Sequence, residues 1–494
     1  MLVYGSFSPF SIYTSVHELI RLAFPGCKIL TSEPMGGDDN RITISLTEQG
    51  NKVGLYGRVE IGVNSTVLNQ EWELNGSQAR NNEVKKLTRR FTYLLLAKHL
   101  KRRLSNYGIL TGVRPVKLVH RLWDQGYSEP EIIEIMKKDY LISQEKAELL
   151  MEIAGNNRPY LLTPEKARKC VSIYIGIPFC LSRCYYCSFP GAVLNDYDQQ
   201  ISPFVETLVK EMTVVGDYIN HHGFNVQTIY LGGGTPTVLS EKDLALVFQL
   251  LHRHYISSAT TEITVEAGRP DTITLAKLKL LKEAGVNRVC INPQTTNDYT
   301  LQTIGRNHNY KEVINAFQLA RKVGINCINM DIIAGLPGEG PRENYQTVKS
   351  ILGLRPENIT VHTLALKRGS QMAELEARKD IEDWASEVKQ GVSLLDRILR
   401  DSGYRPYYLY RQKYMKANME NTGYSIPNHF CLYNMQMIEE RQTIIGLGGG
   451  CRSKFINPMD WTFSSVYNPK DPKAYSQSIA RLLSCKVDKL SALN

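Results

Sequence analysis

The spacing of apolar and polar positions changes near residue 170, which indicates two kinds of structure on either side. Beyond it, short apolar runs typical of strands occur at residues 172–179, 226–233, 262–268, 288–295, 327–335 and 358–366. Stretches with helical spacing, such as 240–255 and 271–285, separate these runs. Because strands that alternate with helices pair in parallel through right-handed crossovers, the pattern predicts an α/β fold. Six such units are too few for an eight-fold barrel, so we expect an open, partial (β/α)6 barrel with its site at the carboxyl ends of the strands.

The residues before this barrel show a different pattern. Short β-like runs at 27–33, 41–48 and 52–63 precede helical spacing from about residue 82 to residue 157. The boundary falls in the segment 158–168, which carries two prolines and flanking charge. We therefore expect three parts: an N-terminal α+β domain at 1–165, the barrel at 166–370, and a C-terminal α+β region at 371–494 that covers part of the barrel.

Composition and charge narrow the class of protein. The 494 residues are 43% hydrophobic and 22% charged, as in a globular chain. No apolar stretch approaches the roughly 20 residues of a membrane-spanning helix. The N-terminus has no basic segment before its apolar residues, which argues against a signal peptide. We expect a cytoplasmic protein.

The net charge of +10 is concentrated in the segment 85–103, which carries eight basic residues and no acidic one. Leu87, Phe91, Leu94 and Leu95 recur there at helical spacing, so the segment is expected to form an amphipathic helix with a basic face. We interpret this face as solvated. The alternatives are an acidic ligand, an RNA or an acidic partner.

Three of the ten cysteines form the cluster C-x-x-x-C-x-x-C at Cys180, Cys184 and Cys187. In a reducing compartment such a cluster indicates metal binding or catalysis rather than disulfides. Zinc takes four protein ligands, or three and a water, and iron–sulfur clusters normally take four cysteines. Three cysteines without a nearby histidine therefore predict a cubane with one iron that lacks a protein ligand and can bind a substrate or cofactor. A zinc site or a chance cluster is the alternative.

This spacing, with the aromatic Tyr186 before the last cysteine, resembles that of the radical S-adenosylmethionine (SAM) superfamily. The resemblance implies a radical SAM barrel with one [4Fe–4S] cluster, whose unique iron is chelated by the amino and carboxylate groups of SAM. On reduction, the cluster would split SAM into methionine and a 5′-deoxyadenosyl radical. The loop "LGGGTPT" at 231–237 resembles the superfamily's loop for the SAM amino group.

Further residues resemble the oxygen-independent coproporphyrinogen III oxidase family. That family's SAM contacts are a Tyr, an aromatic beside the cluster, a GGT loop, Glu, Gln, Arg, Asp and Ala in this order. The matching residues here are Tyr174, Tyr186, Gly233, Gly234, Thr235, Glu266, Gln294, Arg306, Asp331 and Ala365. Glu266, Gln294 and Asp331 are expected at strand ends, and Arg306 in the helix after the fourth strand. The first 165 residues and the segment 408–413 resemble the HemZ-like branch, which carries an extra N-terminal domain.

Two positions depart from the family's pattern. The motif of the oxidases resembles Y-x-H-I-P-F-C, with a histidine where this chain has Gly176. They also place a further cysteine where this chain has Phe189. A sister group of haem chaperones carries Phe at this second position. Both departures fall beside the reactive centre.

The resemblance implies a radical SAM oxidoreductase of haem biosynthesis, which converts two propionates of coproporphyrinogen III to vinyl groups and gives protoporphyrinogen IX without oxygen. Its partners would be this tetrapyrrole, an electron donor such as flavodoxin or ferredoxin, and an electron acceptor, with the chain a monomer that binds no nucleic acid. Arg368, Arg411 and Arg452 are candidates for binding the substrate carboxylates. One alternative is a non-catalytic haem chaperone, with His429 and Cys451 as candidate axial ligands. The other is a radical SAM enzyme on another substrate, in haem degradation or on RNA.

Overall fold

The computed structural model describes residues 1–31, 40–74, 80–187, 192–194, 198–365, 381–412 and 419–493. The chain forms two compact units, Met1–Glu152 and Ile153–Asn494. None of the helices in these described ranges combines the length and apolarity that crossing a membrane requires.

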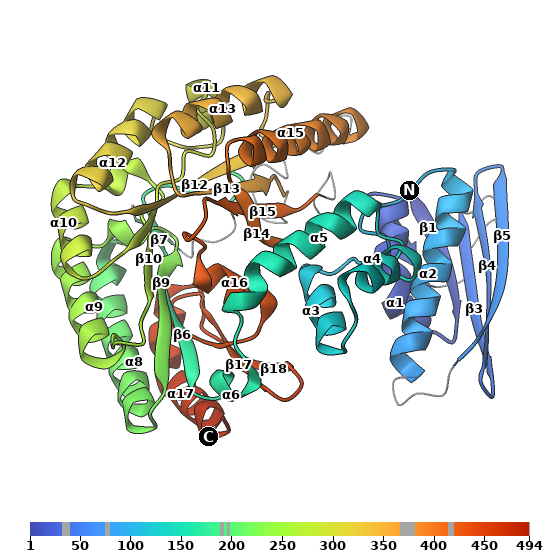
Figure 1. The fold of residues 1–494 in the computed structure, drawn as a ribbon, viewed down its shortest axis with the longest axis horizontal. Helices are drawn as coiled ribbons and strands as arrows, with labels where there is room; N and C mark the ends of the chain where they lie inside the picture. The colour runs from blue at the N-terminus through green and yellow to red at the C-terminus, as the bar shows by residue number, and fades with distance from the viewer. Residues whose placement is uncertain are drawn as a thin grey trace. The chain divides into compact units, whose positions relative to one another are not determined.

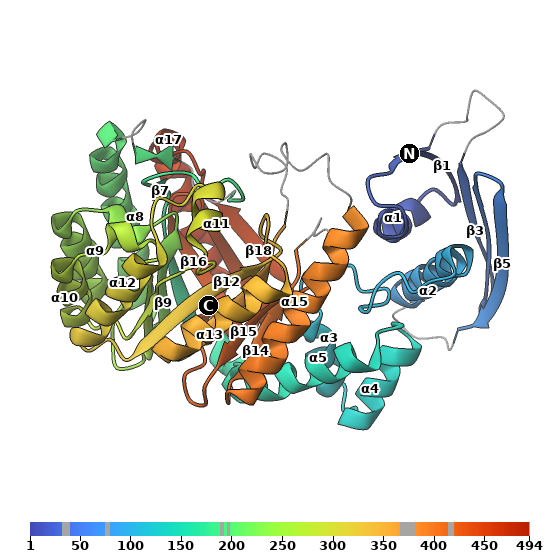
Figure 2. The ribbon, with the colours of Figure 1, turned by 90° about the horizontal axis from the view of Figure 1, so that it is seen from above.

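The first unit is a five-stranded sheet with helices α1 and α2 on one face (Figure 2). Its strands have the order β2-β1-β3-β4-β5, with β1 parallel to both neighbours and the β3-β4-β5 pairs antiparallel. The elements are β1 (Leu2–Ser8), α1 (Ile12–Ala23), β2 (Lys28–Leu30), β3 (Arg41–Gln49), β4 (Lys52–Ile61), β5 (Asn64–Glu73) and α2 (Arg80–Leu100). Three helices follow: α3 (Val116–Asp124), α4 (Glu129–Lys138) and α5 (Gln144–Asn157).

Helix α2 contains the predicted basic segment as far as Leu100 and has an apolar side, but it ends before the last three basic residues, 101–103. Leu87 and Phe91 are buried on its apolar side. Part of its charge is used within the unit, because Arg89 donates hydrogen bonds to two backbone carbonyls and a threonine hydroxyl. Lys86 forms an ion pair with Asp139 at 3.0 Å.

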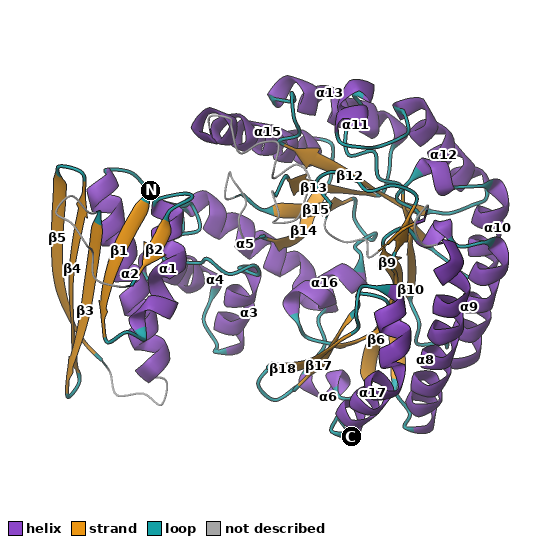
Figure 3. Cartoon of the chain, turned by 180° about the vertical axis from the view of Figure 1, so that it is seen from behind, coloured by secondary structure: helices purple, strands orange, loops and turns teal. Residues whose placement is uncertain are grey.

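An eleven-stranded sheet runs through the described part of the second unit, in the order β14-β15-β13-β12-β11-β10-β9-β6-β16-β17-β18. The six predicted strands are all present and pair in parallel, which confirms the open, partial barrel. They are β6 (Cys170–Ile177), β9 (Asn225–Gly233), β10 (Glu262–Glu266), β11 (Arg288–Cys290), β12 (Cys327–Ala334) and β13 (Asn358–Thr363). Helices lie along the outer face of these strands (Figures 1 and 3). They include α8 (Ile201–His221), α9 (Glu241–His254), α10 (Leu275–Glu283), α12 (Tyr310–Lys322), α13 (Pro341–Leu354) and α15 (Ile381–Asp401).

The C-terminal residues extend this sheet at both edges. Two antiparallel strands, β14 (Arg405–Tyr410) and β15 (Asn421–Ser425), continue it beyond β13. At the other edge β16 (Thr443–Gly448) pairs in parallel with β6, and β17 (Arg452–Ile456) and β18 (Phe463–Tyr467) follow. Helices α16 (Leu432–Glu439) and α17 (Pro472–Ser491) complete the described C-terminal region.

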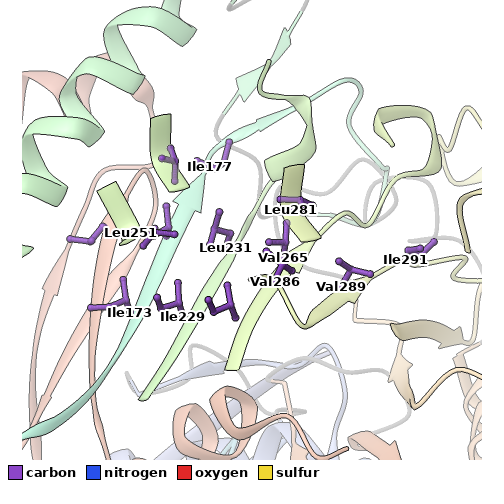
Figure 4. Packing of buried hydrophobic residues seen from close by; sticks show 14 of the residues in the cluster. Ile173, Ile177, Ile229, Leu231, Leu251, Val265, Leu281, Val286, Val289 and Ile291 are labelled. Atoms are coloured by element: carbon purple, nitrogen blue, oxygen red, sulfur yellow. The ribbon is translucent and has the colours of Figure 1, made fainter. Parts of the chain in front are cut away.

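Alternation along the strands gives the barrel an apolar outer face and a polar inner face. On the outer face, Ile229, Leu231 and Val265 pack in one core with helix residues such as Leu251 and Leu281 (Figure 4). Strand residues on the inner face line a cavity; they are Tyr230, Thr264, Glu266, Arg288, Cys290, Asn329, Asp331, Thr360 and His362. The strand pattern therefore concentrates polar groups inside the barrel.

Candidate functional site

The cysteine loop follows β6 and begins at the short strand β7 (Phe179–Cys180), which pairs in parallel with β8 (Ala192–Val193). Cys180 and Cys184 are buried, and Cys187 is half-buried. The N–H of Cys187 donates to the carbonyl of Cys184 at 3.0 Å. Burial raises the pKa of the Cys180 thiol to about 11, so a metal ion is needed to hold this group as a thiolate near neutral pH.

Three cysteine thiols on one loop are the donor set of an iron–sulfur cluster. Among the described residues, no three Cys, His, Asp or Glu side chains converge as a single bound metal ion requires. The cysteine ligands of an iron–sulfur cluster each bind a different iron atom, so their sulfurs need not converge on one point.

The predicted GGT loop lies directly against the cysteine loop. The N–H of Thr235 donates to the carbonyl of Phe179 at 2.8 Å, and the Thr235 hydroxyl is 3.5 Å from the sulfur of Cys180. A Cβ on Gly234 would overlap the Phe179 carbonyl. Gly233 has φ +104°, a conformation that favours glycine. Glycine is therefore required here by the close approach of two backbones.

A second segment, Ile304 to Arg306, also contacts the cysteine loop. The N–H of Tyr185 donates to the carbonyl of Ile304 at 3.0 Å. Arg306 donates from Nη2 to the hydroxyl of Tyr186 at 3.3 Å, which brings two predicted site residues together. The prediction that Arg306 lies in a helix is wrong, because α11 (Asp298–Thr303) ends three residues earlier, followed by Gly305 at φ +75°.

Gln294 has an unusual backbone and an unsatisfied side chain. It lies beyond the end of β11 with φ +69°, a strained value for a residue other than glycine. Its N–H donates to the carbonyl of Asp331, and its own carbonyl accepts from the N–H of Ile333, both at 2.9 Å. The side-chain oxygen is buried and has no hydrogen-bond partner among the described residues.

Two further buried polar atoms near Gln294 lack a hydrogen-bond partner within the described ranges. They are Nε of Arg306 and the side-chain oxygen of Asn292. Buried polar atoms of a native protein are normally paired, so unpaired ones call for a polar ligand. Together with the glycine-lined approach to the cysteine loop, they fit the amino acid and ribose groups of SAM.

Glu266 is at the end of β10, as predicted. One carboxylate oxygen accepts from the Tyr230 hydroxyl at 2.7 Å, and the other accepts from the N–H of Gly233 at 3.2 Å. Burial raises the pKa of Glu266 to about 7, with a smaller contribution from the negative charge of Asp331. This carboxyl group therefore exchanges a proton close to neutral pH.

The prediction that Asp331 stands at a strand end is wrong, because β12 continues three residues beyond it and pairs it with Thr360. Burial acts to raise its pKa, but the His362 imidazole and several hydrogen bonds outweigh burial and lower the pKa overall. The His362 Nε2 lies 3.5 Å from one carboxylate oxygen, and Asn329 donates to the other at 2.8 Å. Asp331 is thus held as a carboxylate while its neighbour Glu266 is easily protonated.

A cavity of about 180 Å³ lies inside the barrel between these two acids. Its lining includes Glu266, Asp331, His362, Tyr230, Tyr408 and Tyr410. The predicted Tyr174 stacks on Tyr230 and on Tyr433 of α16, with ring centroids 5.9 and 6.0 Å apart. Ala365 is buried just beyond β13.

The substrate and haem-ligand candidates are dispersed. Arg452 lies with its guanidinium over the rings of Phe463 and Tyr467, at 5.1 and 5.0 Å from their centroids. Arg411 is buried just after β14. Arg368 and Phe189 lie outside the described residues.

The two candidate axial haem ligands contact different strands. Cys451 lies against Gly176 of β6. The carbonyl of His429 accepts hydrogen bonds from Arg288 and Asn358, the first residues of β11 and β13. The structure does not bring this pair together.

Several site residues escaped the sequence reasoning. Tyr230, His362 and Asn292 face the site from strands or from the segment directly after one. Their signal is the period-two alternation, since each stands two residues from another inward-facing position of its run. Tyr410 comes from β14, and its hydroxyl lies 3.3 Å from Nδ1 of His362. No short-range sequence pattern indicates this contact.

Comparisons with known proteins agree with this site. Residues 174–351 match the family model of the radical SAM superfamily. The chain is 41% identical over 374 residues to the oxygen-independent coproporphyrinogen-III oxidase-like protein HemZ of Bacillus subtilis (strain 168), which covers 76% of this chain and 74% of that protein. It is 38% identical over 198 residues to the heme chaperone HemW of the same organism, which covers 40% of this chain and 51% of that protein.

A solved structure shows the same fold. Coproporphyrinogen III oxidase (HemN) from Escherichia coli, a radical SAM enzyme, superposes with a TM-score of 0.50 at 22% identity and covers 64% of this chain and 70% of that one. Members of the superfamily use a [4Fe–4S] cluster and SAM. The chain therefore belongs to the radical SAM superfamily and, within it, to the family of oxygen-independent coproporphyrinogen-III oxidase-like proteins.

Proposed function

We propose that this protein is a radical SAM enzyme that oxidatively decarboxylates coproporphyrinogen III to protoporphyrinogen IX. The observation that carries the proposal is the contact of the cysteine loop with the GGT loop and with Arg306, together with the unsatisfied buried side chain of Gln294. The 41% identity to a protein named coproporphyrinogen-III oxidase-like, over three quarters of both chains, supports the substrate class.

In this proposal Cys180, Cys184 and Cys187 bind three irons of the cluster. The backbone of Gly233 and Gly234 approaches the cofactor's amino group, which no side chain obstructs. The remaining contacts divide by chemistry. Gln294 and Arg306 supply the unpaired polar atoms for its amino acid part. Glu266 and Asp331 accept hydrogen bonds from hydroxyl groups, while Tyr174, Tyr186, Thr235 and Ala365 shape the pocket around it.

The bound cluster and SAM supply a radical that abstracts hydrogen. The substrate's propionate then loses one β-hydrogen atom, carbon dioxide and one electron, and becomes a vinyl group. An electron donor such as flavodoxin or ferredoxin provides the reducing electron, and a one-electron acceptor takes the electron released. The chain's part is to position the reacting groups and to exclude water from the radical, for which an enclosed site is required.

A haem chaperone is the second candidate function. Gly176 counts against the oxidase, because Cys451 and the carbonyl of Gly449 leave no room at this position for the histidine that the oxidase pattern places there. The likeness to HemW over 198 residues points the same way. The dispersion of His429 and Cys451 removes one proposed pair of haem ligands, so the chaperone would have to bind haem elsewhere.

An anaerobic assay separates the two functions. Protein reconstituted with iron and sulfide is incubated with SAM, a reductant and coproporphyrinogen III, and the products are identified by mass spectrometry. Formation of protoporphyrinogen IX together with 5′-deoxyadenosine supports the oxidase. Protein that holds an intact cluster but forms neither product, and binds haem stoichiometrically, contradicts the oxidase and supports the chaperone.

A further inference from the structure

A buried arginine that belongs to none of the predicted sites contacts the cysteine loop. Arg269 follows β10 and is 3% exposed. Its Nη1 donates to the hydroxyl of Ser182 at 2.8 Å and to the Ser182 carbonyl at 3.2 Å. Ser182 lies between Cys180 and Cys184, so the guanidinium is anchored in the middle of the loop that carries the thiols.

Arg269 also ties this loop to the GGT loop. Its carbonyl accepts from the hydroxyl of Thr272 at 2.8 Å, and the same hydroxyl is 2.6 Å from that of Thr237. The segment after β10 therefore connects the cysteine loop with the residues that follow the GGT motif. A neutral side chain could serve as such a connection, so the buried positive charge needs a separate explanation.

The charge of Arg269 is only partly compensated. Asp271 accepts from Nε and Nη2 at 3.1 and 2.8 Å, and its side chain is 21% exposed to solvent. A second buried cation beside the loop is Arg306, which donates hydrogen bonds to the neutral groups of Gly268, Asn292 and Tyr186 and also interacts with the thiol of Cys184. The adjacent His308 adds no charge near neutral pH, because burial lowers its pKa to about 4.

We propose that Arg269 and Asp271 form a charge pair that sets the reduction potential of the cluster, with Arg269 favouring the reduced state. This inference rests on the proposed cluster ligands. Three thiolates and an added electron make the reduced site more negative, and a nearby buried cation stabilises the more negative state. Net charge and hydrogen bonding around a cluster are known determinants of its potential. Arg269 acts through the loop and the field, and is a positioning residue rather than a catalytic one.

The test is an EPR-monitored redox titration of reconstituted protein without substrate. Arg269→Gln is expected to shift the midpoint potential to a more negative value, because it removes the cation. Asp271→Asn is expected to shift it to a more positive value, because it removes the compensating anion. Arg269→Lys keeps the charge and should stay closer to the natural potential than Arg269→Gln. A merely structural role predicts no such opposite shifts from two partners of one ion pair.

A second ion pair of the same chemistry provides the control. Arg321 binds Glu357 at 2.7 and 2.8 Å and donates to the carbonyls of Ile325 and Asn326, before the start of β12. Arg321→Gln should leave the midpoint unchanged. Shifts of equal sign for the two site variants, or shifts no larger than that of Arg321→Gln, overturn the inference. If Arg269→Gln fails to assemble a cluster, the Asp271→Asn variant decides by itself, and an unchanged midpoint potential in that variant overturns the inference. A natural protein that binds no cluster contradicts the proposed ligands instead.

Discussion

Gly176 of β6 lies so close to the thiol of Cys451 that no Cβ fits between them. The contact is fixed by the backbone, because the N–H of Gly449 donates to the carbonyl of Gly176 at 3.0 Å. The loop after β16 thus occupies the space into which a side chain at position 176 would project. A departure from the family's pattern in one strand is matched by the packing of a segment about 270 residues later.

Substitution of Gly176 is expected to destabilise the fold. Gly176→Ala should lower the free energy of unfolding by about 1–3 kcal/mol through overpacking, and Gly176→His by more. Urea unfolding of the apoprotein measures this. Cys451→Ala combined with Gly176→Ala should recover only part of the loss, because the Gly449 carbonyl also blocks the position. A Gly176→His variant as stable as the natural chain would contradict the packing described.

Each of the three clustered cysteines is expected to be needed for iron binding. Cys180→Ser, Cys184→Ser or Cys187→Ser should lower the iron content after anaerobic reconstitution from about four atoms per chain to a small fraction of that value. Iron and sulfide analysis with visible absorption measures the loss. Cys485→Ser, at a half-buried position of α17, is the matched control and should retain the cluster. Full iron content in the site variants would show that other residues bind the metal.

A buried ion pair holds the C-terminal helix to the barrel. Lys486 of α17 and Glu211 of α8 are fully buried and in contact. Glu211 also accepts from the N–H of Gly448 at 2.7 Å and from the Tyr475 hydroxyl at 2.6 Å. This carboxylate therefore joins α8 and α17 to the end of β16, next to the Gly176 contact.

Lys486→Met is expected to cost about 3–5 kcal/mol of unfolding free energy, because it leaves the Glu211 charge buried without its cation. The double variant with Glu211→Gln should lose less than the single one, and a double-mutant cycle in urea measures the difference. Lys489→Met, at an exposed position of the same helix, should be nearly neutral. Additive losses from the two substitutions would mean that the pair is not coupled.

The sequence was sufficient to predict the six parallel strands, because each carries a compact apolar run and stretches with helical spacing separate the runs. The three cysteines and the GGT loop could also be predicted from the sequence, since each forms a contiguous motif. The position of a residue within its strand was harder to predict from the sequence. Taken as one block, the apolar run 327–335 predicts Asp331 at a strand end, whereas the alternation of side chains puts Asp331 on the inner face in the middle of β12.

Long-range additions to the sheet lay beyond what local patterns contain. The run 443–448 reads as a strand, but its parallel pairing with β6 depends on contacts across about 270 residues. The same holds for Tyr410 of β14, which reaches His362, and for Arg269, whose partner Ser182 is 87 residues away. Such pairs are decided by how the sheet assembles, and single residues give no sign of them.

The titration of Glu266 is expected to appear in the pH dependence of stability. Its pKa is raised from 4.5 to about 7, mainly by burial, so the folded protein holds a proton that the unfolded chain releases in this range. The stabilising contribution of the protonated group is present below pH 4.5 and is lost as the pH rises through about 7. Comparison with Glu266→Gln, which cannot titrate, isolates this contribution.

The unfolding free energy of the natural chain relative to Glu266→Gln should therefore fall by about 3 kcal/mol between pH 4.5 and pH 8. Urea unfolding of both apoproteins across this range measures the difference, in which titrating groups that do not interact with Glu266 cancel. Glu283→Gln, on the exposed surface of α10, is the matched control because its side chain is solvated in both states. A difference that stays constant with pH would show that the Glu266 carboxyl has the same pKa in the folded and unfolded states, and would contradict the effect of its burial.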